Sequence, residues 1–94
     1  MAHPEDAEWV EFDEENEEHI AQHHVTPEEV FQVFEDDPLW AKNKKNMAAV
    51  WLMIGRTHGG RPLVVAVTYD EIRRCVRPVT ARTCEQHEVA RWGV

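Results

Sequence analysis

The first 41 residues of this chain contain no lysine and no arginine. All ten basic residues lie from Lys42 onward, where there are only four acids, whereas residues 1–41 contain fourteen acids. The two parts therefore carry formal charges of −14 and +6, which sum to the −8 of the whole chain. The N-terminal part repels phosphate, whereas the C-terminal part can present a cationic face to it. The alternative is that the two parts neutralise each other across the fold.

Long apolar segments and signals of transport are also absent. The longest apolar run, residues 47–55, is too short to span a membrane, and the acidic N-terminal residues lack the regions of a signal peptide. We therefore expect a cytoplasmic location and no membrane partner. The two cysteines, Cys75 and Cys84, have neither metal-ligand nor redox spacing. Their number allows one disulfide, although a cytosol favours reduced thiols.

The N-terminal part predicts one strand and two helices within a single domain of residues 1–94, in which residues 1–7 form a flexible tail. Residues 8–12 indicate a short strand, and Asp13 can cap the helix that follows. Residues 26–29 form a capping box with proline at the first helical position, and residues 36–38 end this second helix. Its apolar stripe consists of Val30, Phe31, Val33 and Phe34.

The C-terminal part changes to the period of two that is typical of strands. We predict strands at 49–57, 63–69 and 72–79, a hairpin turn at 58–61 and a weaker strand at 39–43. A closing helix over 83–92 would begin with a second capping box, formed by Thr83 and Gln86. The fold class is thus α+β, with β-α-α followed by an antiparallel meander and a C-terminal helix. Two opposite faces are predicted for the 63–69 strand: Leu63, Val65 and Val67 on one, Val64 and Ala66 on the other, with Phe31 and Phe34 covering one of the two faces.

Three arginines are the main candidates for binding an anion: Arg56, Arg77 and Arg82. They lie at or near the ends of strands that should be neighbours, so the fold can bring them together. Arginine is well shaped for bidentate contact with phosphate, and we expect these arginines to matter more than Lys44 and Lys45. The competing interpretation is that the arginines form ion pairs with the acidic first helices.

His23 is the candidate for proton transfer, because histidine titrates near neutral pH. Helical spacing would place it on one face with Phe12 and Ile20, although a histidine on such a face is more often a packing residue. His19 and His23 also have the spacing of a two-histidine metal site. Ile20 stands where the zinc-protease glutamate would follow the first histidine, and no third ligand is obvious, so we expect neither a metal site nor a cofactor.

Several short segments follow one another along the chain in the order found in a known protein family. They are Phe12-Asp13, Asn16, His23 and Val25, Phe34-Glu-Asp-Asp-Pro38, Ile54-Gly-Arg56, Gly60-Arg61-Pro-Leu-Val-Val65, Arg77-Pro-Val-Thr-Ala-Arg82 and Glu88. Together they resemble the BrnT toxin family over nearly all of the chain from Glu8 to Trp92. The resemblance implies a RelE-like fold and a metal-independent endoribonuclease of a bacterial type II toxin–antitoxin system. It also implies a BrnA-like antitoxin with a ribbon-helix-helix domain, through which alone the complex contacts DNA.

The resemblance also implies which residues form the site. The matching residues are His23, Arg56, Arg77, Arg82 and Glu88. The chain departs from the family pattern at Gln22, where the family has lysine, and at His24, where it has glycine. Pro78 and Thr80 interrupt the third strand, and Trp92 replaces a tyrosine. A proline inside a strand predicts a bulge or an edge position.

Two functional hypotheses follow. In the first, the protein is an endoribonuclease in which His23 transfers a proton and the three arginines bind the scissile phosphate. Arg61 and Trp92 would contact the RNA, Trp92 by stacking on a base, although core packing is its alternative role. In the second, the protein is a catalytically weakened or inactive binding module. Its basic sheet face then binds an acidic protein partner or RNA, and Gln22 and the acidic total favour this alternative.

Overall fold

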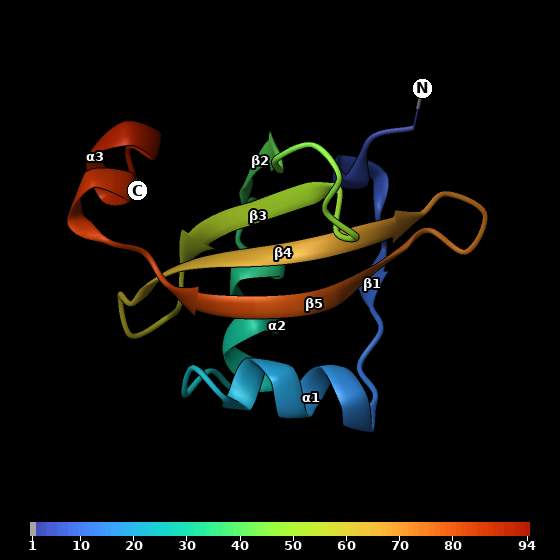
Figure 1. The fold of residues 1–94 in the computed structure, drawn as a ribbon, viewed down its shortest axis with the longest axis horizontal. Coiled ribbons are helices and arrows are strands. Elements are labelled where there is room, and N and C mark those ends of the chain that lie inside the picture. Colours follow the sequence, from blue (N-terminus) through green and yellow to red (C-terminus); the bar gives the residue numbers. More distant parts are fainter. Residues whose placement is uncertain (1) are drawn as a thin grey trace.

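A five-stranded sheet with helices against both of its faces organises the protein (Figure 1), in a computed structural model that describes residues 2–94. The elements in chain order are a short 3₁₀ helix (Pro4–Asp6), β1 (Trp9–Val10), α1 (Glu14–Ala21), α2 (Pro27–Glu35), β2 (Leu39–Lys42), β3 (Trp51–Arg56), β4 (Pro62–Asp70), β5 (Cys75–Thr83) and α3 (Gln86–Trp92). The α+β class is confirmed. Within the described residues, no helix is long and apolar enough to cross a membrane.

The strands lie side by side in the order β1-β5-β4-β3-β2. The neighbours from β2 to β5 are antiparallel, which confirms the meander. The short β1 instead pairs in parallel with β5, with Trp9 opposite Cys75, so the sheet is mixed. This parallel pair joins residues far apart in the sequence, and the local pattern of residues 8–12 gave no indication of its partner.

Both N-terminal helices begin at side chains that satisfy the free N–H groups of the first turn. Asp13 accepts a hydrogen bond from the N–H of Asn16 at 2.8 Å, and the Asn16 side chain accepts one from the N–H of Asp13 at 2.9 Å. Thr26 and Glu29 form the same reciprocal pair at the start of α2. The predicted caps are therefore confirmed, and they fix where the two helices start.

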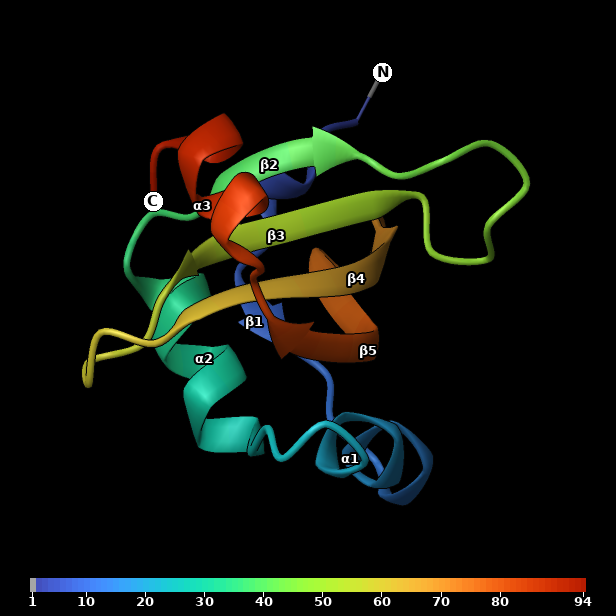
Figure 2. The same cartoon turned by 60° about the vertical axis from the view of Figure 1, so that its left-hand side comes forward.

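The main core lies between the sheet and the first two helices. Leu63, Val65 and Val67 point into it, whereas Val64 belongs to a second apolar cluster on the other face, as the alternation predicts. Figure 2 shows α1 and α2 beneath the sheet and α3 on its opposite side. One packing prediction was wrong: Phe31 is 41% exposed, and the α2 residues that are buried against the sheet are Val30 and Val33. Phe34 packs against this core only in part.

The predicted starts of two elements differ from the structure by three residues each. The third strand begins at Cys75 rather than at residue 72, because the Asp70 carboxylate accepts the N–H groups of Ile72 and Arg73 and closes a turn there. The closing helix begins at Gln86, so Thr83 ends β5 instead of capping α3. Within the segment 1–7, Pro4–Asp6 form the 3₁₀ helix and Pro4 is buried, and Met1 lies outside the described residues. Whether the segment is flexible stays a prediction.

The predicted irregularity at Pro78 is a bulge in β5. Pro78 pairs with Val67 and Thr80 pairs with Ala66, so the residue between them has no partner in β4. The bulge changes which side chains share a face, because side chains alternate along a strand. Arg77 and Arg82 lie five positions apart, yet they pair with Thr68 and Val64, which are four apart in β4. This pairing starts both side chains on the sheet face opposite to the main core, which α1 and α2 leave open, and the guanidinium of Arg77 then reaches Asp13 beside the start of α1.

Candidate functional site

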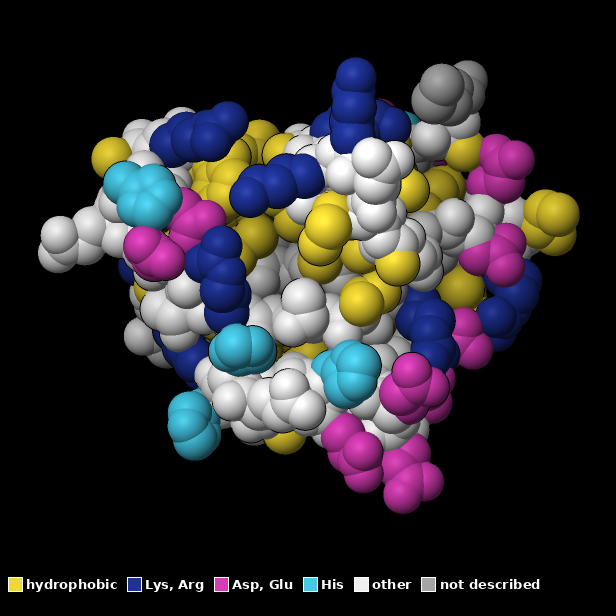
Figure 3. All heavy atoms as spheres, viewed as in Figure 1, with side chains coloured by type: hydrophobic (Ala, Val, Ile, Leu, Met, Phe, Trp, Pro, Cys, Tyr) yellow, Lys and Arg dark blue, Asp and Glu magenta, His cyan; other side chains and the backbone are white. Residues whose placement is uncertain are grey.

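A cleft of about 750 Å³ lies on this open sheet face, between α3 and the loop that joins β2 to β3. In Figure 3, basic side chains border a hollow that exposes hydrophobic side chains, and histidines lie along its α1 side. The floor of the cleft is formed by Leu52 of β3, Val64 and Ala66 of β4, which point away from the main core, and by Thr80 of β5. The residues lining the cleft are His23, Ala41, Lys42, Asn43, Lys44, Met47, Leu52, Val64, Ala66, Thr80, Arg82, Glu85, His87, Glu88, Arg91 and Trp92.

Cations outnumber carboxylates in the cleft, in contrast to the acidic total of the chain. Four basic side chains line it, from β2, the following loop, β5 and α3, against the two carboxylates of Glu85 and Glu88. Sequence reasoning missed Lys42 and Arg91 and gave Lys44 only a minor role. The concentration of basic residues in the C-terminal part was the one sequence feature that indicated Lys42 and Arg91. The guanidinium of Arg91 lies 5.9 Å from the ring centre of Trp92, so charge and aromatic surface meet at one end of the cleft.

Arg82 and Glu88 form a bidentate ion pair inside the cleft. The two guanidinium nitrogens of Arg82 donate to the two carboxylate oxygens of Glu88 at 2.6 and 2.8 Å. Glu88 also accepts the N–H of Glu85 at 2.9 Å, at the start of α3. The hydrogen bonds from Arg82 lower the pKa of Glu88 from 4.5 to about 2. Glu88 is therefore a permanent anion near neutral pH that orients Arg82, whose side chain stays 43% exposed toward the cleft.

His23 lines the cleft, but not in the way the helical spacing predicted. Helix α1 ends at Ala21, so the expectation that His23 extends the helix face of Ile20 was wrong. The chain turns because His24 adopts φ of 58° and the N–H of Val25 bonds back to the carbonyl of Ile20 at 3.1 Å. The exposed His23 is thereby placed at the border of the cleft.

Arg77 lies apart from the cleft, beside the start of α1. Its guanidinium donates to the carboxylate of Asp13 and lines a small cavity of about 80 Å³ with Glu15, Asn16 and His19. The pKa of Asp13 is lowered, first by the N–H of Asn16 and then by Arg77. Arg77 therefore forms an ion pair with the start of an acidic helix, as the competing interpretation of the arginines predicted.

Arg56 and Arg61 both donate to groups of the protein itself. Arg56 donates to the carbonyls of Gly60 and Val94, at 2.5 and 3.0 Å, and so joins the β3–β4 hairpin to the end of α3. Arg61 forms an ion pair with Glu29 of α2 at 3.1 Å. Of the seven residues singled out in the sequence, four line the cleft: His23, Arg82, Glu88 and Trp92.

The described residues contain no group of three or more His, Cys, Asp or Glu side chains arranged to hold a metal ion. The ring of His19 lies 3.3 Å from the carbonyl of Val79, away from the cleft. Cys75 and Cys84 are both free and buried. Burial raises the pKa of each thiol, so both are poorly suited to act as nucleophiles or metal ligands.

The fold and the cleft define a small α+β protein with a cation-lined, partly aromatic groove on an open sheet face, a combination suited to an anionic polymer. The family model of the ribonuclease toxin BrnT of type II toxin–antitoxin systems matches residues 12–88, and the chain belongs to this family. Membership implies an antitoxin partner and an RNA target. The matched range includes every singled-out residue except Trp92. A search of curated proteins found no significant match.

Proposed function

We propose that this protein is the toxin of a type II toxin–antitoxin system and cleaves RNA without a metal ion. The observation that carries the proposal is the cleft, in which His23 and Arg82 lie with three further cations. Metal-free cleavage needs a group that takes the proton of the attacking 2′-hydroxyl and positive charge near the phosphorane. His23 is the proton-transfer group, and Arg82, held by Glu88, binds the phosphate.

The reaction forms a bond from the 2′-oxygen to phosphorus and breaks the bond from phosphorus to the 5′-oxygen. The proton of the 2′-hydroxyl passes to a neutral imidazole, and the departing 5′-oxygen takes a proton from an imidazolium. His87 also lines the cleft and supplies a second imidazole besides His23. Trp92 and Arg91 offer a surface on which an unpaired base can stack.

The test compares cleavage of a total-RNA pool by the unaltered protein and by its His23→Ala variant. We expect His23→Ala to lower cleavage by about 10²–10⁴-fold, the usual contribution of general acid–base catalysis, with no loss of fold. His58→Ala is the matched control, because His58 is exposed on the hairpin turn and does not line the cleft. EDTA should leave cleavage unchanged. Full activity of His23→Ala would remove His23 from the mechanism, and loss in EDTA with recovery in zinc would implicate the His19–His23 pair.

A second candidate function is a binding module without catalysis. Two of the arginines expected to bind phosphate already have carboxylate partners, Arg77 with Asp13 and Arg82 with Glu88. Gln22 also stands where the family has lysine. The two functions differ in one outcome: a binding module holds single-stranded RNA with an affinity that falls steeply with salt, yet cleaves none of it. Binding without cleavage by the unaltered protein would favour this second function.

The antitoxin is proposed to be a BrnA-like ribbon-helix-helix protein, and DNA is contacted only through their complex. We expect the neighbouring open reading frame to encode it. Growth arrest on expression of the toxin alone, relieved by co-expression of that neighbour, supports the pairing. The pairing would be contradicted if the neighbour did not relieve the growth arrest, or if the two proteins formed no complex on size-exclusion chromatography.

A further inference from the structure

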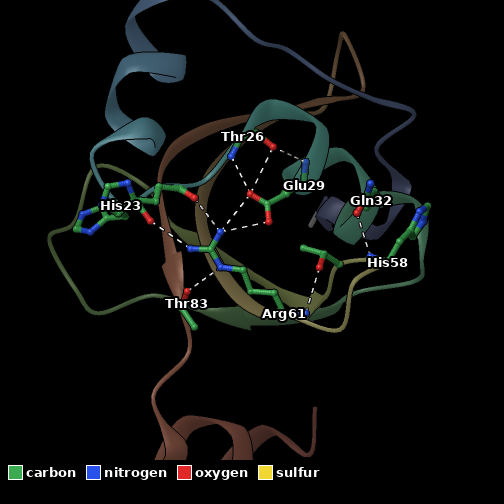
Figure 4. Close-up of polar contacts among 9 residues, drawn as sticks. His23, Thr26, Glu29, Gln32, His58, Arg61 and Thr83 are labelled. Atoms are coloured by element: carbon green, nitrogen blue, oxygen red, sulfur yellow. Dashed lines mark hydrogen bonds and ion pairs between the residues drawn. The ribbon is translucent and has the colours of Figure 1, made fainter.

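The turn that carries His23 is fixed from outside by one side chain. His23 and His24 follow the end of α1, so their carbonyls must find hydrogen-bond partners outside the helix. Both accept hydrogen bonds from the guanidinium of Arg61, at 3.2 Å from Nη2 and 2.8 Å from Nη1. Figure 4 shows this guanidinium between the His23 turn, Glu29 and Thr83.

Arg61 is itself held on three other sides. Its Nη1 lies 3.1 and 3.2 Å from the two carboxylate oxygens of Glu29, and its Nε donates to the hydroxyl of Thr83 at 2.9 Å. Its own N–H donates to the hydroxyl of Thr57 at 3.1 Å. All three guanidinium nitrogens therefore have partners in the protein, which leaves Arg61 poorly placed to bind a phosphate.

The partners of Arg61 lie next to both working residues of the cleft. Thr83 directly follows Arg82 in β5, and the carbonyl on the opposite side belongs to His23 itself. A single planar group thus bridges the turn that carries the imidazole and the strand that carries the phosphate-binding guanidinium. Reacting groups must be placed to well within 1 Å, because an error of that size can cost about 10²-fold in rate.

We propose that Arg61 is a positioning residue that sets where His23 stands relative to Arg82. This inference rests on the proposed ribonuclease function and replaces the direct RNA contact that the sequence led us to expect. A lysine cannot take over this role, because its single ammonium cannot reach Thr83, Glu29 and two carbonyls at once, whereas it would largely preserve a contact to phosphate.

The first experiment measures Arg61→Lys with the total-RNA pool and with a 2′-O-methylated single-stranded RNA that cannot be cleaved. We expect cleavage to fall by about 10²-fold. Affinity for the blocked RNA should stay unchanged, because the lysine keeps the positive charge. If Arg61 instead bound a phosphate directly, the lysine would largely preserve that contact, and cleavage would stay near that of the unaltered protein. Gln32→Ala is the matched control, because it removes a bond from α2 to the same hairpin, at 2.9 Å, without touching the His23 turn. Unchanged cleavage, or a loss of affinity for the blocked RNA as large as the loss of cleavage, would overturn the proposal.

The second experiment is a double-mutant cycle with His23→Ala. If Arg61 acts through His23, then Arg61→Lys should cause no further loss of cleavage once His23 is absent. A full additional loss would show a general structural role and overturn the proposal. Should Arg61→Lys not fold, Thr83→Val keeps Arg61 and cuts only its tie to β5; it should lower cleavage in the same non-additive way.

A third measurement separates this inference from the proposed function. The histidine ring signals in the NMR spectrum of the protein can be assigned to His23 by their loss in His23→Ala. We expect them to shift or broaden in Arg61→Lys and to stay in place in Gln32→Ala. If His23→Ala proves fully active, the proposed chemistry fails, yet altered His23 signals would still establish the positioning. Unaltered signals would overturn the positioning itself.

Discussion

The ion pair between Arg82 and Glu88 allows a quantitative prediction for the variant Glu88→Gln. Glutamine keeps an oxygen that can accept the N–H of Glu85, which lies 2.9 Å from the carboxylate, so the change removes mainly charge. The Glu88 side chain is only 11% exposed, whereas that of Arg82 is 43% exposed. The variant therefore leaves a cation without its partner at the border of the cleft.

The size of the effect follows from the pKa of Glu88. Its fall from 4.5 to about 2 corresponds to about 3 kcal/mol of free energy of unfolding, at about 1.4 kcal/mol per pKa unit. Solvent screening at the exposed Arg82 reduces this value, and we expect Glu88→Gln to cost about 1–2 kcal/mol at neutral pH. For a domain of this size the melting temperature should fall by about 5–10 °C.

The pH dependence of the stability difference tests whether the ionised Glu88 carboxylate is its cause. Because folding lowers the pKa of Glu88, its stabilisation is fully present above the unfolded value of 4.5 and is lost as the pH falls toward about 2. Urea unfolding of both proteins between pH 7 and pH 3 should thus show a difference that is constant above about 4.5 and shrinks below it. Glu18→Gln, at an exposed position of α1, is the control. A difference that stays constant down to the lowest pH, or grows, would refute the reasoning.

Three further predictions concern the core and the thiols. Ile54→Ala should lower the free energy of unfolding in urea by about 2–5 kcal/mol, because Ile54 is fully buried. Ile72→Ala, at a side chain that is 90% exposed, should change the free energy of unfolding by less than about 0.5 kcal/mol. Gly55→Val should cost about 1–3 kcal/mol, since even a Cβ there would lie 3.1 Å from a methyl group of α2; an unchanged melting temperature would contradict this close packing. Cys75 and Cys84 should react with Ellman's reagent far more slowly in the native than in the unfolded protein, because both are buried with raised pKa values, and fast native labelling would contradict that burial.

Much of the fold could be predicted from local patterns. The caps at Asp13 and Thr26 depend on residues within one helical turn, and the two faces of β4 depend on simple alternation, so both were confirmed. The errors lie where a distant partner decides. Phe31 has the right spacing for a core residue, yet the side of α2 that packs on the sheet carries Val30 and Val33 instead. The pairing of β1 with β5 likewise depends on a contact across most of the chain.

The candidate site was predictable only in part. The sequence determined that cations gather in the C-terminal part, and its motifs indicated the family that the match over residues 12–88 shows. It did not distinguish the arginine that faces the cleft from those that lie away from it. Arg82 lines the cleft, whereas Arg56 and Arg61 bond to carbonyls and to Glu29. Residue type sets what a guanidinium can bind, but its partners are set by which segments the fold brings within reach.

The bulge in β5 shows this division within a single strand. Pro78 by itself determined that the ladder would be interrupted, because proline has no N–H to donate. Only the tertiary structure decided that the irregularity is one extra residue between Pro78 and Thr80. In a regular strand, residues five positions apart face opposite sides, so Arg77 and Arg82 would have pointed to different faces. With the extra residue, both side chains start on the face opposite to the main core, because the pairing with β4, rather than the spacing along β5, fixes their direction. Which group each guanidinium then reaches, Asp13 for Arg77 and Glu88 for Arg82, depends on the neighbouring helices.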